Sequence, residues 1–177
     1  MQRKTIDTEE YNPYYSRYLD KLSPDVALLD AYTQGQDRVI SYFSGIPEAQ
    51  HTFRYATGKW SIKEVLQHLI DTERIFMYRA FRIARADKTP LSNYDQDGYV
   101  PTSRADSKSI GNLLREFEAT RTASVALLGS LSDDDLARIG ISSNYPMSAR
   151  AAAFIVPGHD LWHLDIIDEK YLGGDHV

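Results

Sequence analysis

Apolar side chains recur at a mostly helical spacing in four long stretches of the sequence. These stretches cover residues 24–45, 62–85, 106–128 and 148–172. Each is about 20 residues long with one apolar face, so the pattern predicts an all-α four-helix bundle that buries those faces together. The 177 residues, 42% of them apolar, are expected to form a single domain, residues 1–177, with a polar, tyrosine-rich lead-in at residues 1–22.

Local signals mark where these helices begin and where one of them is disturbed. Ser23-Pro24-Asp25 combines a cap residue, a proline at the first helical position and an acid in the first turn, so the first helix is expected to begin there. Ser61 and Glu64 have the spacing of a capping box, in which each side chain accepts a hydrogen bond from the other residue's backbone amide. Pro157 removes a backbone hydrogen bond inside the fourth stretch, so that helix is expected either to kink or to break and restart before His159.

The connection at residues 86–105 contains two prolines and a glycine and is expected to lack regular structure. A link of about 20 residues is unusual in a compact domain and indicates either a function or a long crossover. As a crossover it lets the second and third helices run parallel, which gives the bundle an up-down-down-up order. Residues 133–136 are expected to form a short helical turn, and residues 139–146 a loop that can include a short extended piece.

Three histidines interrupt the apolar faces of two of these helices. His159 and His163 are four residues apart, so a helix places them on one face with their Cβ atoms about 5–6 Å apart. His68 interrupts the face of residues 62–85 in the same way. In the predicted order the second and fourth helices are antiparallel, which sets the first half of one beside the second half of the other. We therefore predict that the three rings converge on one divalent metal ion; the alternative is that each is a hydrogen-bonded core residue.

The chemistry of this ligand set favours an open, catalytic type of metal site. Neutral imidazole suits zinc, nickel, iron or copper, and three protein nitrogens leave further positions for water or substrate. His159 to His163 resembles the His-Glu-x-x-His pattern of zinc proteases, but Asp160 replaces the glutamate and is one methylene shorter. The further downstream ligand of those proteases is also missing, so a zinc protease is disfavoured.

Two acids close to the histidines, Asp71 and Asp160, are the candidate catalytic residues. Asp160 is interpreted first as a solvated helix residue and second as a base or a support for a ligand. Asp71 follows His68 by three residues and can orient its ring or hold a water, with a solvated position as the equal alternative. Residues 94–97 carry two further acids and a tyrosine that can rim the site, although exposed loop acids are the default interpretation.

Charge and cysteine content exclude several classes of function. The net charge is −5 and the two signs are interspersed, so there is no basic patch for nucleic acid or for an anionic membrane. The absence of cysteine excludes disulfides, thiolate metal sites and a cysteine nucleophile. No apolar stretch reaches the length of about 18 residues that a membrane span needs. The sequence thus predicts a soluble, cytoplasmic protein that binds neither nucleic acid nor membranes.

Beyond these patterns, the sequence resembles the DinB-like (YfiT-like) superfamily of metal-dependent enzymes over nearly its whole length. The residues that carry the resemblance are Gly58 to Arg74, Tyr94 to Asp97, and Gly158-His159 together with His163. The resemblance implies a four-helix bundle of up-down-down-up order with a divalent metal on three histidines, which in this sequence are His68, His159 and His163. It implies zinc or nickel as the ion, with iron or manganese as alternatives, and a homodimer.

The resemblance also implies a small-molecule substrate. Relatives include transferases that depend on low-molecular-weight thiols such as bacillithiol or mycothiol, related isomerases, and proteins described as hydrolases. Three hypotheses follow: an enzyme whose metal activates water (a hydrolase) or a thiol cosubstrate (an S-transferase), a non-catalytic metal-binding or stress-response module, and a helical scaffold without metal. Because the chain has no cysteine, any reacting thiol must come from a cosubstrate.

Overall fold

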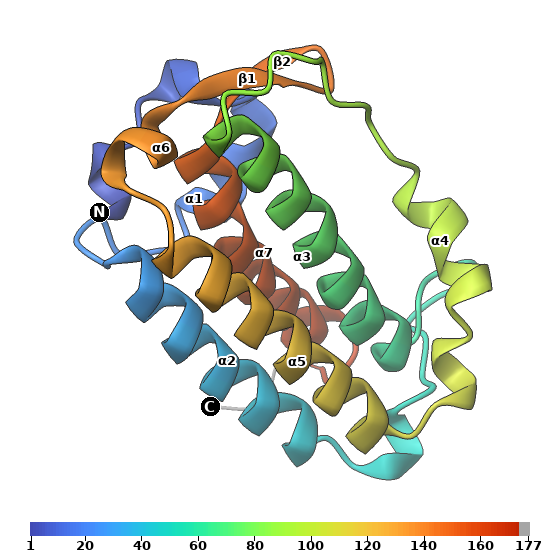
Figure 1. Ribbon diagram of the computed structural model, residues 1–177. Coiled ribbons are helices and arrows are strands. Elements are labelled where there is room, and N and C mark those ends of the chain that lie inside the picture. The colour runs from blue at the N-terminus through green and yellow to red at the C-terminus, as the bar shows by residue number, and fades with distance from the viewer. Residues whose placement is uncertain (174–177) are drawn as a thin grey trace.

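Four long helices pack into a bundle in the computed structural model, which describes residues 1–173 and leaves residues 174–177 of the predicted domain outside (Figure 1). The four helices are α2 (Leu28–Gly45), α3 (Ile62–Ala84), α5 (Ile110–Gly129) and α7 (Ala149–Lys170). The predicted all-α four-helix bundle is confirmed. In Figure 1, α2 and α7 run away from the end that carries the hairpin, whereas α3 and α5 run towards it. The antiparallel pair α3 and α7 makes the most extensive contact between elements.

Shorter elements lie around the bundle. They are α1 (Ser16–Leu19), α4 (Gln96–Ser103), α6 (Asp133–Ala137), and an antiparallel hairpin of β1 (Ile139–Ser142) and β2 (Tyr145–Ser148). In Figure 1, α6 and the hairpin lie at one end of the bundle, and α4 lies along the side of α3. In the hairpin, residue 139 pairs with residue 148 and residue 142 with residue 145. The short helical turn and the extended piece expected between residues 133 and 146 are therefore both present. Within residues 1–173, none of the helices combines the length and the apolar character needed to cross a membrane.

The capping box at the start of α3 is confirmed. The Ser61 hydroxyl accepts a hydrogen bond from the Glu64 amide at 3.1 Å, and the Glu64 carboxylate accepts one from the Ser61 amide at 2.8 Å. These bonds satisfy amides that the first helical turn leaves without partners. They fix the first residue of the helix that carries His68.

The predicted start of the first helix at Ser23-Pro24-Asp25 is wrong, because α2 begins only at Leu28. The N-terminal segment lies alongside these residues and takes up their backbone groups: the amide of Lys4 donates to the Pro24 carbonyl at 2.8 Å, and the amide of Leu28 donates to the Met1 carbonyl at 3.1 Å. A long-range pairing therefore overrides the local helix signal. The third long helix also begins later than predicted, at Ile110 after the cap residue Ser109, rather than near residue 106.

The long connection at residues 86–105 is not structureless, which corrects the expectation for it. It contains α4, whose first turn is capped by Asp95 through a hydrogen bond from the Gly98 amide at 3.2 Å. Arg104 ends this helix in the left-handed region with φ of 52°. The segment runs along the open side of α3 and returns the chain to the end of the bundle where α3 began (Figure 1).

The apolar core is divided into two clusters with a polar layer between them. One cluster surrounds Tyr32 and Phe76 towards the hairpin end, and the other surrounds Phe43 and Leu66 towards the opposite end. Between them, buried polar side chains extend inward from three of the long helices; they include Glu73, Arg121, Ser124, His159, Asp160 and His163. Such a layer is stable only where its polar atoms find partners.

Pro157 lies within α7, and the helix continues through it without a break. Proline cannot donate the backbone hydrogen bond that the carbonyl of Ala153 would otherwise accept. The hydroxyl of Tyr32 on α2 donates to that carbonyl instead, at 2.9 Å, so the freed acceptor is satisfied from a neighbouring helix. A cross-helix hydrogen bond thus compensates for the proline immediately before the His159 turn.

Because Gly158 has no side chain, α1 lies closer to α7 than it could with any other residue at this position. A Cβ atom at this position would lie 2.2 Å from the backbone oxygen of Tyr18, which is far inside van der Waals contact. The missing side chain lets the tyrosine-rich lead-in pack directly on α7. In this position the lead-in places two aromatic rings on the bundle: Tyr15 contacts Phe76, with ring centroids 5.6 Å apart, and Tyr18 contacts His159 at 5.1 Å.

We predict that Tyr32→Phe lowers the free energy of unfolding by about 1–3 kcal/mol, because the Ala153 carbonyl loses its donor in a buried position. In a Pro157→Ala background the new backbone amide can bond to that carbonyl, so Tyr32→Phe should then cost less. Chemical denaturation of the wild type, both single variants and the double variant measures this coupling. Equal costs of Tyr32→Phe in the two backgrounds would contradict the account.

Candidate metal centre

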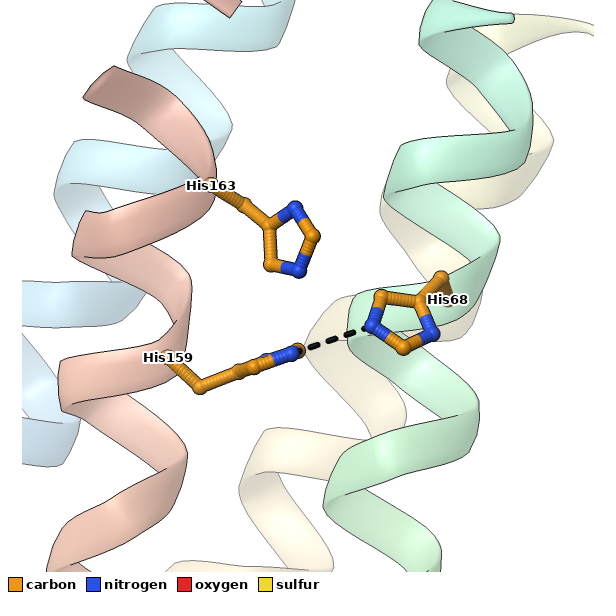
Figure 2. Close-up of side chains that lie close together, drawn as sticks. All are labelled: His68, His159 and His163. Carbon is orange, nitrogen blue, oxygen red and sulfur yellow. Dashed lines mark hydrogen bonds between the residues drawn. The ribbon is translucent and has the colours of Figure 1, made fainter. Parts of the chain in front are cut away.

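The rings of His68, His159 and His163 converge between α3 and α7 (Figure 2). The Nε2 atoms of His68 and His159 are 3.0 Å apart, and one nitrogen from each of the three rings lies within 4.8 Å of the others. All three side chains are buried, with 4–7% of their surface exposed. The predicted meeting of two histidines on one helix with a third on its antiparallel neighbour is therefore present in the structure.

The three rings fit a divalent ion in both spacing and charge. Zinc–nitrogen bonds of about 2.0–2.1 Å in tetrahedral geometry hold neighbouring nitrogens about 3.3 Å apart, close to the 3.0 Å between the Nε2 atoms of His68 and His159. Burial lowers the pKa of His68 to about 4, and it lowers the pKa of His159 and His163 well below the ordinary value. All three are therefore neutral near pH 7, the form that binds metals. The buried Nδ1 of His163 has no hydrogen-bond partner among the described residues.

An aromatic ring covers each histidine. Trp60 packs on His68 with ring centroids 4.6 Å apart, Trp162 contacts His163 at 4.9 Å, and the ring of Tyr18 meets His159 edge-on at 5.1 Å. These rings remove water from the imidazoles, which strengthens electrostatic interactions at the cluster.

A chain of hydroxyl groups links His68 to the segment before α4. The Nδ1 atom of His68 lies 3.4 Å from the hydroxyl of Thr72, one turn along α3. That hydroxyl is 3.1 Å from the phenolic oxygen of Tyr94. Partners of this kind fix the orientation of a ligand ring and leave its other nitrogen free for the metal. Residues 94–97, which the sequence suggested as a rim, thus reach the site through Tyr94.

The cluster opens into a cavity of about 610 Å³. His68 and His163 form part of its wall, together with aromatic side chains from the lead-in, the loop before α3, and α7. Gln96 and Asp97 of α4 also line the cavity, as do the basic residues Lys59 and Arg54. This volume falls in the range of small-molecule sites, about 300–1,000 Å³.

Asp160 is fully buried, so its first interpretation as a solvated helix residue is wrong. Its carboxylate accepts a hydrogen bond from Arg121 on α5 at 2.6 Å. The same guanidinium donates to Glu73 on α3 at 2.9 and 3.1 Å, and the exposed fraction of all three side chains is 0–1%. Burial raises the pKa of both carboxyl groups. Burial alone would lower the Arg121 pKa, but the two acids outweigh it and raise that pKa.

Asp71 occupies a half-buried position beside the cluster. Its carboxylate accepts hydrogen bonds from Gln67 at 3.1 Å and from Arg74 at 3.2 Å, and burial raises its pKa. It lines a small recess that also includes His68 and Tyr94. No hydrogen bond joins it directly to an imidazole within residues 1–173. Its catalytic role stays a prediction.

Arg121 was not identified from the sequence, although a signal for it exists. It lies on the apolar face of α5, four residues after Phe117 and seven before Leu128, and all three side chains are buried. A charged residue at such a position needs buried partners. The sequence does not show which acids supply them, because Glu73 and Asp160 are 48 and 39 residues away. The aromatic cover of the histidines likewise becomes visible only in the fold.

Comparisons with known proteins agree with this architecture. The sequence profile of the DinB superfamily matches residues 31–167. Among solved structures, the chain is similar to YfiT from Bacillus subtilis, described as a probable metal-dependent hydrolase with an unusual four-helix bundle topology. The TM-score is 0.71 with 17% identity, over 90% of this chain and 91% of that one.

A second similar structure is the mycothiol-dependent maleylpyruvate isomerase, with a TM-score of 0.63 and 14% identity. The match covers 85% of this chain but only 64% of the isomerase. No curated protein sequence matches the chain significantly. At these identities the two structures show a shared fold, and they do not transfer a reaction to this chain.

The lowered histidine pKa values predict that the metal-free protein loses stability as the pH falls from 7 to 5. An unfolded histidine takes up a proton near pH 6.5, whereas His68 in the folded state does so only near pH 4. Protonation therefore favours the unfolded state below pH 6.5, by about 1.4 kcal/mol per pH unit for each such histidine. Urea titrations of chelator-treated protein at pH 7, 6 and 5 measure the slope. His68→Gln should make it shallower, and an unchanged slope would contradict the assignment.

Proposed function

The chain belongs to the DinB superfamily, and from that premise we propose that it is an enzyme that acts on a small molecule with a divalent metal held by His68, His159 and His163. The observation that carries the proposal is the convergence of three buried, neutral imidazoles at the wall of a 610 Å³ cavity. A structural metal site is normally closed by four protein ligands, whereas a catalytic site keeps a position open. The cavity beside His68 and His163 supports the open type. It argues against the alternative of a non-catalytic metal-binding or stress-response module.

We propose zinc or nickel as the ion, with iron or manganese as alternatives. Imidazole nitrogens suit zinc and nickel well, and the described part of the chain offers no carboxylate oxygen within the three-histidine cluster. A bound ion would supply Lewis acidity, which lowers the pKa of a coordinated water or thiol and polarises a carbonyl group. The remaining contributions come from the protein itself.

The side chains around the cluster have separable roles in this proposal. Thr72 holds the ring of His68 in the orientation that points its Nε2 atom inward, with Tyr94 as the next member of the chain. Trp60, Trp162 and Tyr18 exclude water from the imidazoles. For Asp160 we propose a positioning role through Arg121, since its hydrogen bond holds α7 at the turn that carries His159. Asp71 is proposed as a residue that supports the site from the recess beside His68.

Hydrolysis is the first candidate reaction. The similar YfiT structure is described as a probable metal-dependent hydrolase, and this similarity extends over nine-tenths of both chains. The second candidate is transfer of a low-molecular-weight thiol. Its support is the cavity volume, which leaves room for a cosubstrate, and the similar fold of a mycothiol-dependent isomerase. A homodimer in the cytoplasm completes the proposal; light scattering of the purified protein tests the dimer.

We predict that protein purified without a histidine tag contains one divalent ion per chain, and that His68→Gln or His163→Gln loses it. His51→Gln is the matched control, because His51 is also buried but bonds to the backbone oxygen of Ile46 and lies outside the cluster. Elemental analysis measures the metal, and thermal melting measures the fold. Metal loss with an unchanged melting temperature supports a catalytic ion. Full metal content in both cluster variants would disprove the assignment.

The two candidate reactions are separated by activity assays on the metal-loaded protein. We expect hydrolysis in a panel of esters and amides, with activity reduced to background in His163→Gln and retained in His51→Gln. Conjugation of a low-molecular-weight thiol to electrophiles, without hydrolysis, would select the second candidate instead. Activity that survives removal of the metal from the folded protein would exclude both.

A further inference from the structure

A second cavity, of about 420 Å³, lies between α3 and the segment that leads to α4. Residues 75–82 of α3 form one wall, and residues 89–94 with Tyr99 form the other. None of the three clustered histidines lines it. The cavity contains two arginines, Arg79 and Arg82, and no aspartate or glutamate. In a chain of net charge −5, this is a local concentration of positive charge.

Arg79 is the residue that makes this cavity unusual, because only 2% of its surface is exposed. Its Nη2 atom donates to the backbone oxygen of Ser92 at 3.1 Å and to the hydroxyl of Ser143 at 3.3 Å. Both acceptors are neutral. Among residues 1–173, no acidic side chain forms an ion pair with it. Its positive charge is therefore buried without a counter-charge in the described part of the chain.

Arg121 provides a direct comparison within the same protein. It is buried to a similar degree, and two carboxylates, those of Glu73 and Asp160, face it. A buried charge normally requires a partner of this kind, because transfer from water costs more than neutral hydrogen bonds return. The rings of Phe76 and Tyr94 lie 5.0 and 5.6 Å from the Arg79 guanidinium and partly stabilise it. They do not neutralise it.

We propose that this cavity binds the anionic group, a carboxylate or a phosphate, of a small organic molecule. A guanidinium has five N–H donors in a planar fork that matches the oxygens of such groups, and both hydrogen bonds to Ser92 and Ser143 use Nη2. The hydroxyl of Tyr15 also lies beside this guanidinium, and the N–H donors that these neutral groups do not use are left for the anion. The volume exceeds that of an inorganic ion, and the half-exposed rings of Tyr78 and Tyr99 offer apolar surface to the rest of the molecule.

Arg82 contributes less than Arg79 to this site. Its guanidinium is already paired with Asp87 and bonded to the hydroxyl of Tyr78. It lies one turn further along α3 and adds positive potential at the same cavity. The site is separate from the proposed enzymatic function, because none of its residues is a metal ligand. Its wall residue Tyr94 also lines the recess beside His68, so the two sites are neighbours.

Calorimetric titration of the metal-loaded protein with inorganic phosphate, phenyl phosphate and benzoate tests the proposal, with neutral benzamide as the control ligand. We expect at least one anion to bind and benzamide not to bind. Arg79→Met should weaken binding about tenfold or more, the cost of a lost charge-assisted hydrogen bond. Arg82→Gln should weaken it less. Arg85→Gln is the matched control, since Arg85 is an exposed residue after the end of α3 and does not line the cavity.

A parallel titration of His68→Gln separates this site from the metal, which can itself bind anions. Binding that persists in His68→Gln and is lost in Arg79→Met supports the proposal. Binding lost in His68→Gln and unchanged in Arg79→Met overturns it, as does the absence of binding at about 10 mM of every anion. If Arg79→Met does not fold, the wild-type NMR spectrum decides. The signals of the Arg79 Nε–H and of the backbone amides of Thr89 and residues 91–94 should shift on titration, and unchanged signals would refute the site.

Discussion

The guanidinium of Arg121 is the interaction on which the arrangement of the bundle depends, because it contacts all four long helices. It extends from α5, forms ion pairs with Glu73 on α3 and Asp160 on α7, and lies 3.4 Å from the backbone oxygen of Tyr32 on α2. Removal of one partner from a buried ion pair costs about 3–5 kcal/mol, since the other charge is left without compensation. A bundle in which any helix slid by one turn would break these bonds.

This constraint also sets the positions of the three clustered histidines. Glu73 follows His68 by five residues on α3, and Asp160 is adjacent to His159 on α7. The ion pairs that hold these acids therefore hold the two helices that carry the three histidines. The polar layer has two parts with different access to solvent. The acids and Arg121 are sealed inside the bundle, whereas His68 and His163 reach the wall of the large cavity. One layer thus combines a sealed interior with two histidines that line a cavity.

The backbone of α7 is adapted to the same site. Pro157 leaves an acceptor that Tyr32 satisfies, and Gly158 leaves the space that α1 fills. The close approach of α1 sets the ring of Tyr18 against His159. Two residues that are unfavourable in a helix interior therefore lie where the helix has its closest contacts with other elements. Both precede the histidine pair by one or two residues, which couples the lead-in and α2 to the position of His159.

The sequence alone determined the features that depend on neighbouring residues. Helical periodicity gave the four helices, the Ser61–Glu64 capping box gave the start of α3, and the four-residue spacing gave the shared face of His159 and His163. These features follow from a fixed helical geometry, so residue order is sufficient to find them. The sequence also identified His68 as the third member, since a polar residue on an apolar face stands out from its neighbours.

Only the tertiary structure decided the features that depend on distant residues. The helix signal at Ser23-Pro24-Asp25 was overridden by pairing with the N-terminal segment, and Asp160 proved to be buried against Arg121, 39 residues away. The residues next to Asp160 in the sequence do not show whether its carboxylate faces water or a guanidinium. Its environment is set by the packing of the other helices, which short-range patterns do not encode. The burial of Arg79 and the aromatic cover of the histidines have the same origin.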